Sequence, residues 1–99
     1  MDLLIVVSTD AARPIFTELA NACTRAKSEW SVFFTHRGTL VAADAQIAGL
    51  IESSSQAVAC HDSWSRFVDE NKQVPSGIEM GSQTNHSEMA GLAGRIISL

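Results

Sequence analysis

The chain has 99 residues, 45% hydrophobic and 18% charged, and a formal net charge of −4. This fits one compact domain and excludes both a disordered chain and a two-domain enzyme. Its seven lysines and arginines form no cluster, which argues against a nucleic-acid partner and a polybasic membrane patch.

The N-terminal apolar run lacks the basic segment of a signal peptide. No apolar run approaches the roughly 20 residues of a membrane helix. The two cysteines are too few for a disulfide framework. We therefore expect a protein of the reducing cytoplasm, with no membrane partner.

The first half of the chain predicts two strands and two helices. Leu3–Val7 is a continuous β-branched run, typical of a strand buried on both faces. Polar residues 8–10 and Pro14 favour a helix start after it. We expect the inward stripe of that helix to consist of Ile15, Leu19, Ala22, Cys23 and Ala26. The next predicted elements are a strand at Trp30–Phe34, a loop at 35–38, an ambiguous segment at 40–43 and a short helix at 44–51.

The second half predicts three more strands and two helices. In chain order these are a strand at Gln56–Cys60, a helix at 61–70, a loop at 71–77, a short strand at 78–81, a helix at 85–93 and a strand at 95–99. In the helix at 61–70 we expect Trp64, Phe67 and Val68 to share one side. In the helix at 85–93 we expect Met89 and Leu92 to point inward.

Strands that alternate with helices indicate a parallel sheet covered on both faces. Right-handed crossovers make this a small doubly wound domain. The predicted fold class is therefore α/β: one domain over residues 1–99, with a mostly parallel five-stranded sheet and helices on both faces.

The carboxyl edge of that sheet is the expected site of function, because ligands of open α/β sheets bind beyond the strand ends. Four polar segments follow the first four strands and should meet there. The residues that we expect to line a pocket at this edge are Ser8, Thr9, Asp10, His36, Gly81 and Ser82.

Cys60 is the most informative residue, since it ends a predicted strand and directly precedes a helix. A helix N-terminus stabilises anions and lowers the pKa of a thiol placed there. Arg37 and a protonated His61 are candidates for stabilising the thiolate further. A nucleophilic or persulfide-carrying cysteine needs such surroundings. The alternative is that Cys60 is a small buried hydrophobic residue, which is what we expect of Cys23.

The remaining motifs point to no metal and no cofactor. There is no Cys-x-x-Cys and no pair of histidines three to five residues apart. A zinc site would need the fold to gather His36, Cys60, His61 and His86. Glycine-rich phosphate loops and the Gly-x-Ser-x-Gly motif are absent from the sequence, so residues 8–10 indicate helix capping.

Three segments resemble the DsrE/DsrF-like sulfur-relay family, which includes the Tus-type subunits of tRNA thiolation. They are WSVFFTHRG (30–38), AVACHDSW (57–64), and IEMGS (78–82) leading through Ala90 to RIISL (95–99). The likeness spans most of the chain in order and spacing. The chain differs from the family in having a shorter segment between the second and third strands and bulkier residues after the cysteine. The resemblance implies a DsrE-like fold, with Cys60 at the position of the persulfide-carrying cysteine.

The predicted function is therefore that of an intracellular sulfur carrier or sulfurtransferase, and the resemblance implies sulfur-donor and sulfur-acceptor proteins as partners. Family members are commonly oligomers, which implies a homo-oligomer, either a trimer or a hexamer. A chain of this length buries only about 60–70% of its unfolded surface alone, which also favours a subunit contact. Two alternatives are a non-catalytic oligomeric α/β binding module and a redox sensor that oxidises Cys60 to a sulfenic acid.

Overall fold

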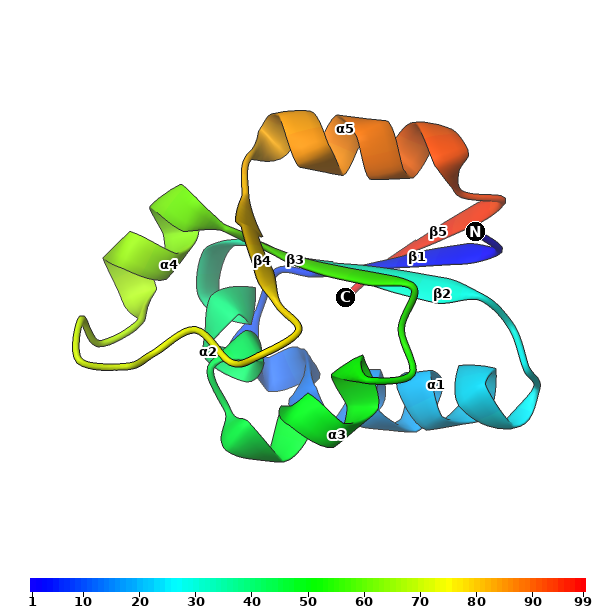
Figure 1. Cartoon of the computed structure of the whole chain (residues 1–99), viewed down its shortest axis with the longest axis horizontal. Helices are drawn as coiled ribbons and strands as arrows, with labels where there is room; N and C mark the ends of the chain where they lie inside the picture. The colour runs from blue at the N-terminus through cyan, green and yellow to red at the C-terminus, as the bar shows by residue number, and fades with distance from the viewer.

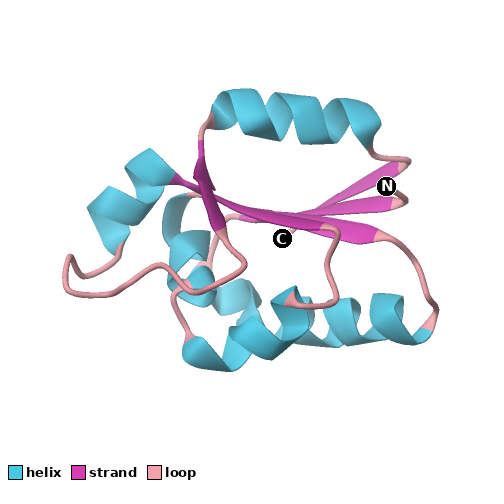
Figure 2. Cartoon of the chain, in the orientation of Figure 1, coloured by secondary structure: helices cyan, strands magenta, loops and turns pink.

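The computed structural model describes residues 1–99 as a parallel sheet between helices (Figure 1; Figure 2). The strands are β1 (Leu3–Val7), β2 (Trp30–Phe34), β3 (Gln56–Cys60), β4 (Glu79–Gly81) and β5 (Arg95–Ser98), in the order β4-β3-β2-β1-β5. The helices are α1 (Arg13–Arg25), α2 (Thr39–Ala42), α3 (Ala48–Ile51), α4 (His61–Phe67) and α5 (Gln83–Leu92), with 3-10 turns at Asp10–Ala12, His36–Gly38 and Ala45–Ile47. None of these helices has the length and apolar character needed to cross a membrane.

The two faces of the sheet are covered unequally, and the strand order explains why. β1 to β4 follow one another in one direction across the sheet, whereas β5 lies on the far side of β1. All neighbouring strands are parallel. A right-handed crossover that runs back across the sheet must place its helix on the opposite face. Accordingly α5 covers one face alone, and α1, α2 and α3 lie on the other (Figure 1). This confirms the predicted fold class.

The sheet divides the core into two apolar clusters. The larger holds 19 buried residues on the α1 side, where the rings of Trp30 and Phe34 each pack edge to face against Phe16. The smaller lies under α5 and contains Leu4, Val6, Phe33, Val58, Cys60 and Met89. Cys23 belongs to the larger cluster, so the two cysteines lie on opposite faces of the sheet.

The buried stripe of α1 is rotated from the predicted one. The buried residues are Phe16, Ala20 and Cys23, and Leu19 is half-buried, whereas Ile15, Ala22 and Ala26 are exposed. An aromatic ring buries more apolar area than an isoleucine and packs favourably edge to face. Phe16 therefore determines which side of α1 turns inward, and the prediction of an inward Ile15 was wrong.

Four other elements differ from their predicted form. The ambiguous segment 40–43 contributes to α2, and the helix predicted at 44–51 begins as a 3-10 turn. The helix predicted at 61–70 ends at Phe67, because Val68 takes an extended backbone and buries its side chain. Leu92, predicted to point inward, is 71% exposed. The small residues Ala90, in α5, and Ala93, directly after it, pack against the smaller cluster instead.

Candidate active site

The loops that follow β1 to β4 meet at the carboxyl edge of the sheet, as the topology predicts. Side chains from different loops contact one another there. The Arg37 guanidinium lies 3.3 Å from the Asp10 carboxylate, which links the loops after β1 and β2. The side-chain nitrogen of Gln83 lies 3.5 Å from the Thr35 hydroxyl, which links the loops after β4 and β2.

The turn after β2 packs directly against the end of β1. A Cβ atom at Gly38 would overlap the carbonyl oxygen of Val7, so this approach needs a glycine. His36 has a left-handed backbone with a φ of 49°, a conformation that costs a non-glycine residue about 1–3 kcal/mol. Its N–H donates to Ser63 Oγ at 2.9 Å, and its carbonyl accepts from the Thr39 hydroxyl at 2.9 Å. The turn is thereby tied to the first turn of α4.

Cys60 is the last residue of β3 and the N-cap residue directly before α4. Side chains alternate along a strand, and in β3 this places Val58 and Cys60 on the α5 face. The Cys60 side chain is 6% exposed. The side-chain nitrogen of Gln83, itself an exposed residue, lies 4.0 Å from its Sγ. The sulfur thus lies in a buried residue, beside the polar side chain of an exposed one.

Burial acts to raise the pKa of the Cys60 thiol, but hydrogen-bond donors outweigh it and the net pKa is lowered. These donors are the N–H and hydroxyl of Ser63, the N–H of Asp62 and the side-chain amide of Gln83. Sγ forms no capping hydrogen bond at the start of α4. The N–H groups therefore lower the pKa by stabilising the charged thiolate, and not by bonding to the neutral thiol. Because Ser63 Oγ accepts from the His36 N–H, its own hydrogen is free for the sulfur.

Cys23 has the opposite surroundings. It is 8% exposed on the buried side of α1 and packs within the larger apolar cluster. Burial raises the pKa of its thiol, and no donor opposes that effect. The structure therefore matches the prediction that Cys23 fills the core.

The two residues predicted to stabilise the thiolate lie at this edge without contacting the sulfur. Arg37 pairs with Asp10, and its guanidinium carbon lies 5.8 Å from the centre of the Phe67 ring. This Arg37 hydrogen bond holds the pKa of the Asp10 carboxyl below its usual value. His61 is the exposed first residue of α4. Neither side chain is among the donors to Cys60, and their role in stabilising the thiolate stays a prediction.

Ser63 and Gln83 are the site residues that the sequence analysis missed. Ser63 is three residues after Cys60, in the first turn of α4. Gln83 is the first residue of α5, directly after the Ser82 cap. A search for polar residues in the first turn of each helix at the carboxyl edge would have found both.

The residues predicted to line a pocket mostly make local structural contacts. The Ser8 hydroxyl donates to the Leu99 carbonyl at 2.8 Å, and Thr9 accepts from the Ala11 N–H at 3.2 Å. Gly81 pairs in register with Cys60. Ser82 is the N-cap residue of α5, and its N–H donates to Asn85 Oδ1 at 2.9 Å.

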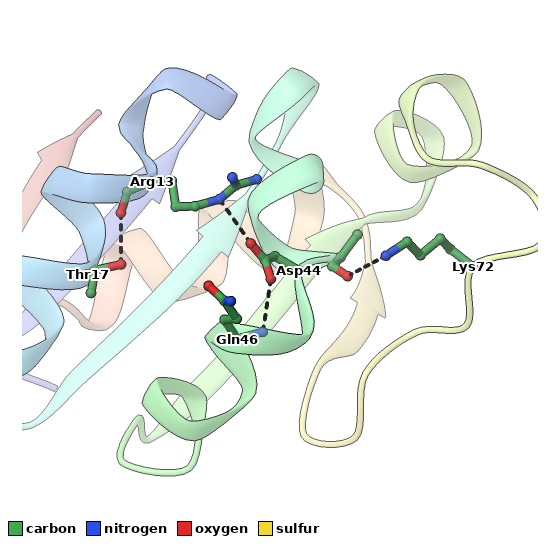
Figure 3. A network of polar contacts seen from close by, with 6 residues as sticks. Arg13, Thr17, Asp44, Gln46 and Lys72 are labelled. Carbon is green, nitrogen blue, oxygen red and sulfur yellow. Dashed lines mark hydrogen bonds and ion pairs between the residues drawn. The ribbon is translucent and has the colours of Figure 1, made fainter.

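None of the three cavities of the chain is lined by Cys60. One, of about 500 Å³, is lined by Asp10 among others. Beside it runs the polar network of Figure 3, in which Arg13 pairs with Asp44 at 3.3 Å. Asp44 also accepts from the Gln46 N–H at 2.9 Å, and Lys72 donates to the Ala43 carbonyl at 3.4 Å. No group of three or more His, Cys, Asp or Glu side chains is arranged to hold a metal ion.

Comparison with known proteins supports the fold. No family model matches the sequence, and no curated protein does. The crystal structure of the ychN protein from E. coli is similar to this chain, with a TM-score of 0.71 over 100% of both chains and 12% sequence identity. This likeness supports the predicted DsrE-like α/β fold. At that identity the likeness extends to the arrangement of strands and helices and not to the chemistry of Cys60.

Proposed function

We propose that this chain is a sulfur carrier that passes sulfane sulfur through a persulfide on Cys60. The observation that carries the proposal is the set of donors around Cys60, which lowers the pKa of a buried thiol against the effect of its burial. A lowered pKa increases the fraction of thiolate, which is the nucleophilic form. The DsrE-like fold and the position of Cys60 at a strand end support the same function.

The transfer consists of two exchange steps with no net oxidation. In the first, the Cys60 thiolate attacks the outer sulfur of a donor persulfide. The new S–S bond forms on Cys60, the donor's S–S bond breaks, and the donor cysteine leaves as a thiolate. In the second, an acceptor thiolate attacks the outer sulfur on Cys60, and Cys60 leaves as a thiolate. A thiol of low pKa is also a good leaving group, so the same donors favour both steps.

The surroundings of Cys60 favour a protein-bound substrate. No cavity of the chain includes Cys60, so a small metabolite would find no enclosed site there. Sulfur-donor and sulfur-acceptor proteins are therefore the proposed partners. Both cysteines are free, which suits a reducing compartment such as the cytoplasm.

A homo-oligomer is part of the proposal, because apolar side chains lie exposed at one edge of the sheet. Leu92, Ile96 and Ile97 are 71%, 50% and 37% exposed, at and beside the edge strand β5. An unpaired strand edge with apolar side chains is a common site of subunit contact. A trimer or a hexamer is what the family resemblance implies.

Discharge of bound sulfur to cyanide tests the proposal. The protein is incubated with glutathione persulfide, freed of excess reagent and treated with cyanide, which removes an outer sulfur as thiocyanate. We expect wild type and Cys23→Ser to release thiocyanate and Cys60→Ser to release none. If wild type releases none, or if Cys60→Ser releases as much, Cys60 is not a sulfur carrier. The result would then favour the non-catalytic binding module.

A further inference from the structure

The side-chain amide of Gln83 has polar partners at both of its ends. Its nitrogen lies 4.0 Å from Cys60 Sγ and 3.5 Å from Thr35 Oγ1. Its oxygen lies 3.2 Å from Nδ1 of His86. One residue therefore connects the reactive sulfur to an imidazole one turn further along α5.

The orientation of this amide decides its effect on the sulfur. The oxygen and nitrogen of a glutamine side chain have nearly the same shape, so hydrogen-bond partners choose between its two orientations. With the nitrogen toward Cys60, the amide donates to a thiolate. With the oxygen toward Cys60, a partial negative charge faces the thiolate and disfavours it. The Thr35 hydroxyl does not choose between them, because a hydroxyl both donates and accepts.

His86 fixes the orientation of the Gln83 amide when the ring carries its hydrogen on Nδ1, because that N–H can only donate. Residues three apart on a helix lie on the same face, which brings the ring of His86 beside Gln83. The ring stacks on Phe33, with centroids 5.0 Å apart and planes at 17°. Phe33 is fully buried in β2, so the His86 ring packs against a side chain that is held in place by the core. An Nδ1–H on His86 has the Gln83 oxygen as its acceptor at 3.2 Å.

We propose that His86 is a positioning residue, which donates from Nδ1 to the Gln83 oxygen and thereby holds the Gln83 nitrogen toward Cys60. The His86 ring, which stacks on the buried Phe33, then holds the Gln83 amide in place beside Cys60. This inference deepens the proposed function, since a sulfur carrier needs the thiolate of Cys60 both as a nucleophile and as a leaving group.

The test compares variants that separate the ring from its donor. His86→Phe keeps an aromatic ring for stacking and removes Nδ1. His86→Asn loses the ring but places its side-chain nitrogen at the same number of bonds from Cα as Nδ1, so it can still donate. Gln83→Ala removes the amide itself, and Gln83 is exposed, so that variant should fold. The double variant Gln83→Ala/His86→Phe completes the cycle.

The readout is the pKa of Cys60, measured as the pH dependence of its alkylation by iodoacetamide. Trypsin cuts after Arg37 and Arg66, so the peptide of residues 38–66 carries Cys60 and no other cysteine. Circular dichroism checks that each variant is folded. Because alkylation requires no sulfur donor, the measurement does not depend on the proposed transfer.

We expect His86→Phe and Gln83→Ala each to raise the Cys60 pKa by about half a unit to one unit, the size of a hydrogen bond to a charged group weakened by its length. His86→Asn should stay close to wild type. The double variant should shift no further than Gln83→Ala. The inference is overturned if His86→Phe leaves the pKa unchanged, or if its shift persists undiminished in the Gln83→Ala background. The proposed function fails separately, if wild type takes up no sulfur while these pKa shifts are seen.

Discussion

Cys23 and Cys60 lie on opposite faces of one sheet, and their side chains are 8% and 6% exposed. Burial pushes the pKa of both thiols upward. At Cys23 it acts alone, and the side chain packs within the larger apolar cluster. At Cys60 donors from α4 and α5 reverse the direction. The comparison shows that, for two cysteines of similar exposure, the donors around the sulfur decide the direction in which the pKa moves.

The largest expected difference is in alkylation rate. With iodoacetamide near neutral pH, we expect Cys60 to react at least about 100-fold faster than Cys23, because the lowered pKa of Cys60 increases its thiolate fraction and the raised pKa of Cys23 decreases it. The tryptic peptides 38–66 and 1–25 report the two sites separately. Equal rates in the folded protein would remove the distinction between the two cysteines. Unfolding in denaturant is the control, and there the rates should converge.

The second difference concerns stability. Cys23→Ser places a hydroxyl among apolar side chains and should lower the free energy of unfolding by about 1–3 kcal/mol. Cys60→Ser should cost little or even stabilise by up to about 1 kcal/mol, because serine is a preferred residue at a helix start. Urea unfolding of the two matched variants measures both. A larger loss at Cys60 than at Cys23 would contradict the assignment of Cys23 to the core.

The third prediction concerns the donor nearest to Cys60 in sequence. Ser63→Ala removes a hydroxyl that lowers the Cys60 pKa and should raise that pKa by about one unit. Ser65→Ala, on the exposed side of α4, is the matched control and should leave that pKa unchanged. The pH profile of alkylation gives the values. A shift as large in the control would mean that helix stability, and not the hydroxyl, is being measured.

The smallest effect is the pH dependence of folding. The folded-state pKa of Cys60 is lowered, so its stabilising contribution is present above the unfolded-state pKa and is lost as pH falls through the folded value. The folded-state pKa of Cys23 is raised, so its contribution is lost as pH rises through the folded value. From about pH 7 to about pH 10, wild type should gain stability relative to Cys60→Ser and lose it relative to Cys23→Ser. Slopes of the same sign in both comparisons would contradict the opposite pKa directions.

The sheet and the place of Cys60 were predictable because buried parallel strands are continuous apolar runs. β1, β2 and β3 have the predicted bounds, so Cys60 falls at a strand end as expected. The phase of α1 was not predictable from spacing alone. Both Ile15 and Phe16 are apolar, and the choice between them depends on the rings of Trp30 and Phe34, which come from another element.

The donors around Cys60 were beyond the reach of sequence patterns for a similar reason. Gln83 reaches the sulfur because β4 pairs with β3 so that Gly81 lies beside Cys60. That register places the start of α5 next to the end of β3. Charge led the sequence analysis to Arg37 and His61, whereas the donors that lower the pKa are neutral groups.

The location of bound sulfur tests the central claim most directly. The protein is incubated with glutathione persulfide, digested with trypsin under conditions that preserve persulfides, and weighed by mass spectrometry. We predict a mass gain of one sulfur atom on the peptide 38–66, which contains Cys60, and none on the peptide 1–25, which contains Cys23. Added sulfur on the Cys23 peptide, or on neither peptide, would contradict the account.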